Sequence, residues 1–140
     1  MKYLLPKYLL LVSLLLSASA LAQQPLSYNK CIRTAMTQTA MNLCSYRKAV
    51  LLGRQLNNVY HKLLLEATSE PSATANIVAM ERAWVTYRDR YMAAMYPAKD
   101  KQAEYGSIYP LEANLLLAQL TKTHITALEV LLKQYGPAVH

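Results

Sequence analysis

The sequence predicts an all-α protein: a compact antiparallel bundle of three main helices with a disulfide-pinned N-terminal arm. Apolar residues recur at three- and four-residue spacing over three long segments, and no segment alternates polar and apolar residues as a half-buried strand does. The chain also has only two cysteines, Cys31 and Cys44, which follow an apolar leader. About 118 residues come after that leader, enough for one hydrophobic core but not for two domains.

The leader has the pattern of a secretory signal peptide. Two lysines precede an apolar run over residues 8–16, and Ala20 and Ala22 supply the small residues of a cleavage site. We therefore expect residues 1–22 to be removed and residues 23–140 to form the exported domain, in the periplasm or secreted.

A retained membrane anchor is the alternative interpretation of the same segment. Ser13 and Ser17 interrupt its apolar stretch, which falls short of the roughly 20 residues that a spanning helix needs. The sequence thus predicts no membrane span after cleavage.

In an exported chain, two cysteines most simply form one disulfide, and closing so short a loop contributes roughly 3 kcal/mol in the chain-entropy description. On one continuous helix Cys31 and Cys44 would lie about 20 Å apart, too far to bond. The chain must therefore turn between them, and we expect residues 27–39 to fold back as an arm. The three histidines are dispersed, so the sequence predicts no metal site and no cofactor.

Three helices follow from the apolar spacing and its interruptions. The first runs from about Ala40 to the Ser-Glu-Pro sequence at 69–71, and the second ends at Pro97. The third starts at Pro110, which suits a first helical turn, and stops at Gly136.

The second helix carries a Met and aromatic stripe that we expect to be buried as core. A haem or hydrophobic-ligand site is the alternative interpretation, but helical stripes of this kind are usually core. Its members are Ile77, Met80, Trp84, Tyr87, Tyr91 and Met95.

Residues 97–109 are polar and are expected to form an ordered loop. Tyr96, Tyr105 and Tyr109 cluster around it. Tyrosine is enriched at interfaces but also packs well against helix ends, so the cluster is either a recognition patch or ordinary packing.

Charge restricts the class of partner. Without the two lysines of the leader, 13 basic residues face 8 acidic ones, a net charge of +5. The basic residues form no long run, which favours a solvated helical surface with weak attraction to anionic envelope polymers. Nucleic acid is not expected for an exported chain without a recognised binding motif.

Several motifs, in chain order, resemble the LprI-type lysozyme-inhibitor-like family of exported bacterial domains. Besides the two cysteines they are Leu56-Asn57-x-x-Tyr60, Trp84-x-x-Tyr87-Arg88-Asp89, Gly106-Ser107-Ile108-Tyr109-Pro110 and Leu120-Thr121. The resemblance spans nearly all of residues 23–140 and is fairly specific in combination. It implies an all-helical, non-enzymatic protein of the cell envelope, and the naming member of the family inhibits lysozyme.

The chain departs from the family pattern in two pairs of positions. Met92 and Leu116 stand where members usually carry a second cysteine pair, and both replacements are apolar. Gly53 replaces an acidic residue and His124 a basic one, which suggests that a charge pair between two helices was lost as a unit. The role of that pair is therefore not transferred to this chain.

Arg88 and Asp89 are the most conspicuous polar residues of the motifs. Because a partly buried charge needs hydrogen-bonding partners, we expect a network that ties the second helix to the 97–109 loop or to Asn57. The alternative is exposed contact with a partner. His61 and His124 are expected to be ordinary helix-face residues.

Two functions remain open, and neither is enzymatic, since no nucleophile elbow, metal triad or phosphate loop is present. The first is an inhibitor that binds and blocks a lysozyme or muramidase, with Lys99, Lys101, Tyr105 and Tyr109 as candidate contacts to a cleft that works with two carboxylates. The second is a periplasmic interaction module that binds another envelope protein or an anionic envelope polymer. The net charge of +5 favours the second, because it would repel a basic lysozyme.

Overall fold

The computed structural model describes residues 27–136, and this part of the chain is helical without any strand. The predicted signal peptide lies outside the described residues. The elements, in order, are α1 (Tyr28–Thr34), α2 (Gln38–Glu66), α3 (Pro71–Met95), α4 (Lys101–Tyr105), the 3-10 helix η1 (Gly106–Ile108) and α5 (Tyr109–Tyr135). The predicted all-α class with three main helices is confirmed.

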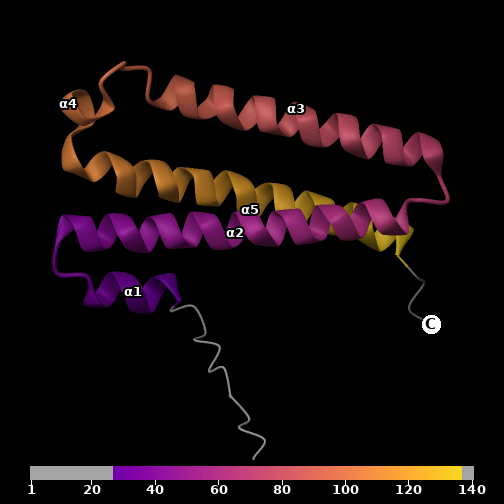
Figure 1. Cartoon of the computed structure of the whole chain (residues 1–140), viewed down its shortest axis with the longest axis horizontal. Helices are drawn as coiled ribbons and strands as arrows, with labels where there is room; N and C mark the ends of the chain where they lie inside the picture. Colours follow the sequence, from indigo (N-terminus) through magenta and orange to yellow (C-terminus); the bar gives the residue numbers. More distant parts are fainter. Residues whose placement is uncertain (1–26, 137–140) are drawn as a thin grey trace, which may run out of the picture.

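Consecutive long helices run in opposite directions, so that α2 and α5 run parallel to each other (Figure 1). The three helices do not share contacts equally. The most extensive packing is between α2 and α5, while α3 rests on α5 and α1 lies against the start of α2. The hydrophobic core lies toward the end of the bundle where α2 turns into α3. Its buried residues are Leu56, Leu63, Ala67, Ile77, Ile125 and Leu128.

Polar side chains and prolines define the helix starts. The Thr37 hydroxyl accepts a hydrogen bond from the Ala40 N–H (3.1 Å) and so caps α2, which begins two residues before the predicted start. Pro71 and Pro110 lie in the first turns of α3 and α5, where a missing N–H costs nothing.

The predicted loop over 97–109 is wrong in part, because it contains α4 and η1. The Asp100 carboxylate accepts a hydrogen bond from the Ala103 N–H (2.9 Å) and caps α4. Gly106 ends that helix at φ +70°, a conformation that favours glycine. A local cap and a local stop therefore build a short helix that apolar spacing does not reveal.

The predicted disulfide is confirmed. Cys31 of α1 and Cys44 of α2 are bonded with a Cα–Cα distance of 5.7 Å, and the chain turns between the two helices. The N-terminal arm is thus a short helix pinned to the start of α2 (Figure 1).

The prediction that the α3 stripe is buried holds for only part of it. Ile77 is buried and Trp84 packs partly against the core, but Tyr87 (55%), Met95 (50%) and Tyr91 (37%) are exposed. The reason is that α2 and α5 pair with each other, so that α3 joins the core mainly through its N-terminal half.

One described segment, Lys101–Tyr135, is long and apolar enough to cross a membrane by length and composition alone. A core helix passes the same test, and α5 packs along α2.

Candidate functional site

Three tyrosines form a packed cluster at the end of the bundle that holds α4. Tyr96 is buried, and its ring meets those of Tyr105 and Tyr109 edge-on, with centroids 5.4 and 5.0 Å away. The Tyr105 hydroxyl also accepts a hydrogen bond from the Ala98 N–H (3.2 Å). Burial, followed by the negative charge of Glu112 and the other two tyrosines, raises the pKa of Tyr96 above its ordinary 10.0. We call Tyr96, Tyr105 and Tyr109 the tyrosine cluster.

Lys101 stabilises the backbone next to this cluster. Its Nζ donates hydrogen bonds to the Tyr96 carbonyl (2.6 Å) and the Ala98 carbonyl (2.9 Å), just beyond the end of α3. The Lys99 side chain, in contrast, is exposed. Of the four predicted partner-binding residues, Tyr105 and Tyr109 therefore pack together, Lys101 is bonded to the backbone at the end of α3, and Lys99 presents its charge to solvent. Their role in partner binding stays a prediction.

A second polar group joins α3 to α5. His124 Nε2 lies 2.7 Å from Glu81 Oε2, and the Trp84 ring stacks on the His124 ring with centroids 4.3 Å apart and planes within 4°. His124 is only 8% exposed. The Arg88 guanidinium lies over the Trp84 ring, 5.2 Å from its centroid.

Sequence reasoning missed this partner of His124. It expected an ordinary helix-face residue left behind by a lost charge pair, whereas the structure shows a nearly buried side chain with an acidic partner on α3. A signal was present, since Glu81 precedes Trp84 by three residues and so lies on the same side of the helix.

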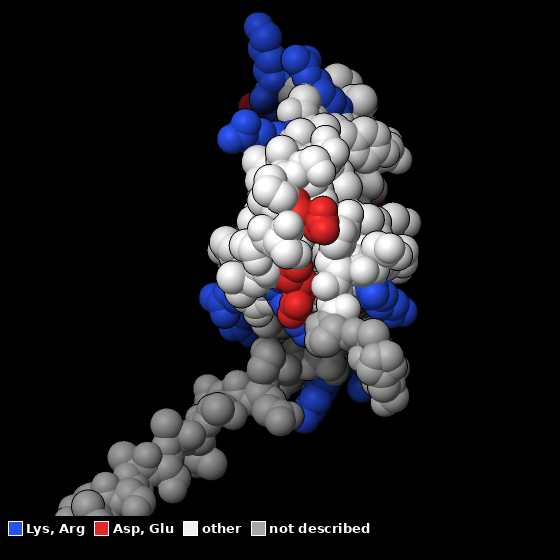
Figure 2. Space-filling view, turned by 90° about the vertical axis from the view of Figure 1, so that its right-hand side faces the viewer, with Lys and Arg blue, Asp and Glu red and all other residues white. Residues whose placement is uncertain are grey.

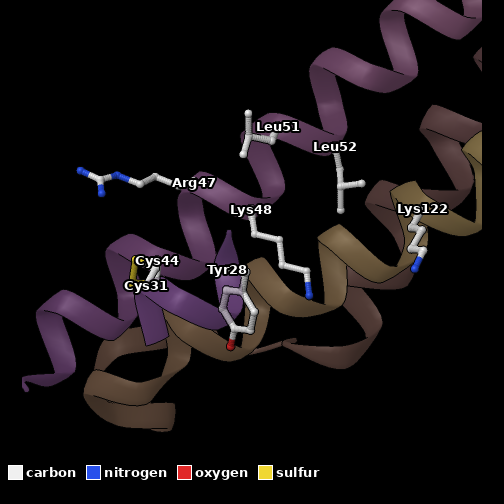
Figure 3. Close-up of a pocket in the computed structure, with 8 residues that line it drawn as sticks. All are labelled: Tyr28, Cys31, Cys44, Arg47, Lys48, Leu51, Leu52 and Lys122. Carbon is white, nitrogen blue, oxygen red and sulfur yellow. A yellow bond between two sulfur atoms is a disulfide. The ribbon is translucent and has the colours of Figure 1, made fainter. Parts of the chain in front are cut away.

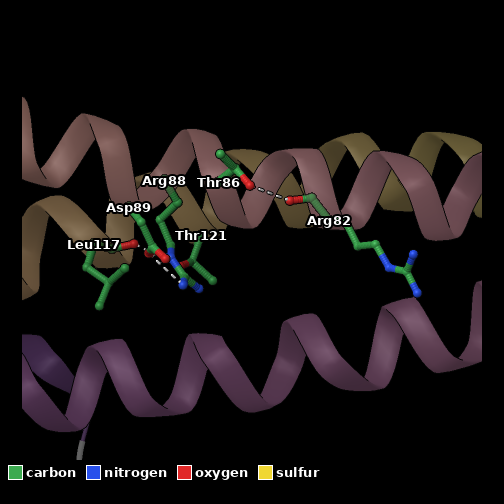
Figure 4. Close-up of polar contacts among 6 residues, drawn as sticks. All are labelled: Arg82, Thr86, Arg88, Asp89, Leu117 and Thr121. Atoms are coloured by element: carbon green, nitrogen blue, oxygen red, sulfur yellow. Dashed lines mark hydrogen bonds and ion pairs between the residues drawn. The ribbon is translucent and has the colours of Figure 1, made fainter.

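The predicted network from Arg88 to the loop or to Asn57 is wrong. Arg88 pairs with its sequence neighbour Asp89, with Nη2 and Oδ1 2.7 Å apart, and their side chains are 28% and 63% exposed (Figure 4). Asn57 is exposed on α2. The reason is again the position of α3, which rests on α5 and not on the face of α2 that carries Asn57.

Other hydrogen bonds near Arg88 stay within single helices. The Thr86 hydroxyl donates to the Arg82 carbonyl (3.1 Å), and the Thr121 hydroxyl donates to the Leu117 carbonyl (2.8 Å) (Figure 4). The remaining motif residues contribute to packing: Leu56 is buried in the core and Tyr60 lies against it.

A pocket of about 300 Å³ lies beside the disulfide, where α1, α2 and α5 meet. Its apolar wall is formed by Tyr28, Leu51, Leu52 and the Cys31–Cys44 bond. Its charged residues are Arg47, Lys48 and Lys122, and Figure 3 shows Lys48 and Lys122 on the same side as the Tyr28 hydroxyl, with Arg47 directed away. We call it the disulfide pocket.

Sequence reasoning did not find the disulfide pocket, although one signal was present. The first acidic residue of the whole chain is Glu66, so that α1 and α2 together carry six basic residues and only that one acid at the end of α2. The packing of α5 against α2 determines which of these cations lie together at the pocket.

Within residues 27–136 no three His, Cys, Asp or Glu side chains are grouped as metal ligands, and both cysteines of the chain are in the disulfide. The disulfide indicates an oxidising compartment.

Comparison with protein families matches residues 29–128 to the family described as lysozyme inhibitor LprI. Comparisons with curated proteins and with solved structures give no significant match. The family match covers well over half of the chain, from the start of α1 through most of α5, and includes both cysteines. The chain therefore belongs to the LprI family.

Proposed function

We propose that this protein is an exported inhibitor that binds and blocks a lysozyme or related muramidase. The observation that carries the proposal is the family match over residues 29–128. The Cys31–Cys44 bond supports export, since such bonds persist in oxidising compartments, and residues 1–22 have the composition of a signal peptide. The mature protein is then periplasmic or secreted.

The end of the bundle around α4 is the surface best built for such a contact. Lys99 projects from a segment that the tyrosine cluster and the two hydrogen bonds of Lys101 hold in place. The Asn42 amide also donates to the Ser107 carbonyl (3.1 Å), which ties η1 to α2. Because the segment is ordered before binding, little conformational entropy is lost when it docks.

Lys99 supplies the charge that a muramidase cleft would attract. Glycoside hydrolysis uses two carboxyl groups that flank the scissile bond, and an ammonium placed between them would pair with both and exclude the substrate. Tyr105 and Tyr109 are half-buried, and their exposed parts can add contact area beside Lys99.

Lysis of a peptidoglycan substrate by several lysozymes, with and without the purified oxidised protein, tests the proposal. We expect stoichiometric inhibition of one lysozyme class. Lys99→Met should weaken inhibition roughly tenfold, the effect of losing one charge-assisted contact. Lys133→Met, which removes the same charge from exposed α5, is the matched control. Lack of inhibition at every salt concentration would refute the inhibitor function. An equal loss of inhibition in both variants would refute the assignment of the contact surface to the α4 end.

The charge distribution favours one second candidate, a non-enzymatic envelope module that binds an anionic polymer or another envelope protein. Residues 27–65 carry six basic and no acidic residues, whereas residues 66–136 carry seven basic and eight acidic ones. Figure 2 views the end where α2 turns into α3 and shows acidic side chains near the middle of that face, with basic ones toward its edges. Salt-sensitive binding to peptidoglycan or lipopolysaccharide without lysozyme inhibition would support this candidate.

A further inference from the structure

The disulfide pocket combines an apolar wall with cationic side chains. Its volume of about 300 Å³ is at the lower end of the range for small-molecule sites, so it accommodates a small ligand or one end of a longer one. Leu51, Leu52 and the disulfide give it an apolar wall.

Its cations have no acidic partner. No Asp or Glu lines the pocket, and none of its three basic residues forms an ion pair within the described chain. Lys48 Nζ lies 4.4 Å from the centre of the Tyr28 ring, a cation–π contact that fixes the ammonium at the pocket without cancelling its charge.

Lys48 and Lys122 come from different helices and lie on the same side of the pocket (Figure 3). Two ammonium groups brought to one site repel each other, and an anion between them would turn that repulsion into two charge-assisted hydrogen bonds. An anion alone would leave the leucine wall in contact with water, whereas an attached aliphatic chain would cover it.

We propose that the disulfide pocket binds a single-chain anionic amphiphile, with its phosphate or carboxylate head between Lys48 and Lys122 and its aliphatic chain against Leu51, Leu52 and the Cys31–Cys44 bond. The pocket lies toward the same end of the bundle as α4 (Figure 1), but it shares no residue with Lys99 or the tyrosine cluster and does not depend on lysozyme inhibition. Either proposal can fail while the other stands.

Three probes separate the contributions of head and chain. Octyl phosphate carries both, inorganic phosphate carries the head alone, and octyl glucoside carries the same chain with an uncharged head. Calorimetric titration of the purified oxidised protein, with each detergent below its micelle concentration, measures affinity and stoichiometry. We expect one octyl phosphate per chain, with the other two probes at least roughly tenfold weaker, because each lacks one half of the interaction.

Two double variants locate the site. Lys48→Met with Lys122→Met should weaken octyl phosphate binding by roughly tenfold or more, as expected for the loss of two charge-assisted contacts. Lys62→Met with Lys133→Met removes one lysine from each of the same two helices outside the pocket, at exposed positions, and should leave binding within about twofold. Far-ultraviolet circular dichroism checks that both variants fold.

Several outcomes would overturn the proposal. Equal losses in the two double variants would indicate general charge attraction, and equal binding of octyl glucoside would indicate a purely apolar site. Inorganic phosphate that binds as tightly as octyl phosphate would indicate a simple anion site. Unfolding of the protein without one-to-one binding would show that the pocket does not hold the amphiphile.

Discussion

The contact between Glu81 and His124 is the main polar link between α3 and α5. Its two side chains are 16% and 8% exposed, and Trp84 stacks on the imidazole. A polar group buried from water is stabilised by its hydrogen bond. If its partner is removed, the desolvation penalty remains and no hydrogen bond compensates for it. This contact therefore matters more to stability than the exposed Arg88–Asp89 pair.

Replacing Glu81 by Ala should lower the free energy of unfolding by about 1–3 kcal/mol, because His124 would remain buried without its partner. Urea denaturation followed by circular dichroism measures the change. Glu129→Ala, at an exposed position of α5, is the control and should have little effect. Equal effects of the two substitutions would show that the contact adds nothing to stability.

Tyr96 gives the protein a predictable response to alkaline pH. Because its pKa is raised in the folded state, the folded protein holds this proton more tightly than the unfolded chain. The resulting stability is fully present below pH 10.0 and is lost as the pH rises through the higher folded-state value.

Tyr96→Phe keeps the ring and removes the ionisable hydroxyl, so its stability should fall less steeply above pH 10.0 than that of the unsubstituted protein. Denaturation midpoints from pH 8 to pH 11, roughly the window in which tyrosine titrates, measure this slope. Tyr46→Phe, at a 55% exposed position, should leave the slope unchanged. Identical slopes for both variants would contradict the assignment to Tyr96.

At the scale of elements, the long helices differ in how firmly they are held. α2 and α5 pack along each other, whereas Ile77 is the one fully buried residue of α3. α1 is short, and it is held to the start of α2 by packing and by the disulfide, which contributes roughly 3 kcal/mol for a loop of this size. We therefore expect α3 to open locally more readily than the α2–α5 pair.

Amides in the second half of α3, residues 87–95, should exchange with solvent at least about tenfold faster than those of residues 121–128 in α5. The α5 segment contains Thr121, His124, Ile125 and Leu128, all buried, whereas Tyr87, Tyr91 and Met95 are exposed. Hydrogen exchange followed by mass spectrometry or NMR measures the rates. Equal protection would mean that α3 is held along its whole length.

At the scale of the whole molecule, charge is distributed unevenly along the chain. Basic residues outnumber acidic ones six to none over residues 27–65, and the net charge of residues 23–140 is +5. A muramidase that is itself basic would meet long-range repulsion, whereas an anionic polymer would be attracted.

The rate of association with a basic lysozyme should therefore rise as ionic strength increases toward about 0.15 M, where screening limits repulsion to about 8 Å. The dissociation rate should change little, because it depends on short-range contacts. Surface plasmon resonance across a salt series separates the two rates. An association rate that falls with salt would show that local attraction, such as that of Lys99 to cleft carboxylates, outweighs the net charge.

The sequence by itself determined the features that depend on neighbouring residues. Apolar spacing predicted the three long helices, the prolines at 71 and 110 lie in their first turns, and two cysteines after an apolar leader predicted the disulfide. The motifs predicted the family. These features follow from interactions within a few residues along a helix or across one short loop, which a single sequence displays directly.

Only the tertiary structure decided how the helices meet. Long-range packing pairs α2 with α5, which are far apart in the chain, and this leaves half of the α3 stripe exposed. The same pairing gives His124 its partner Glu81 and brings Lys122 to the pocket beside Lys48. Spacing along one helix shows which residues share a face, but the neighbour that covers this face depends on the free energy of packing the whole chain.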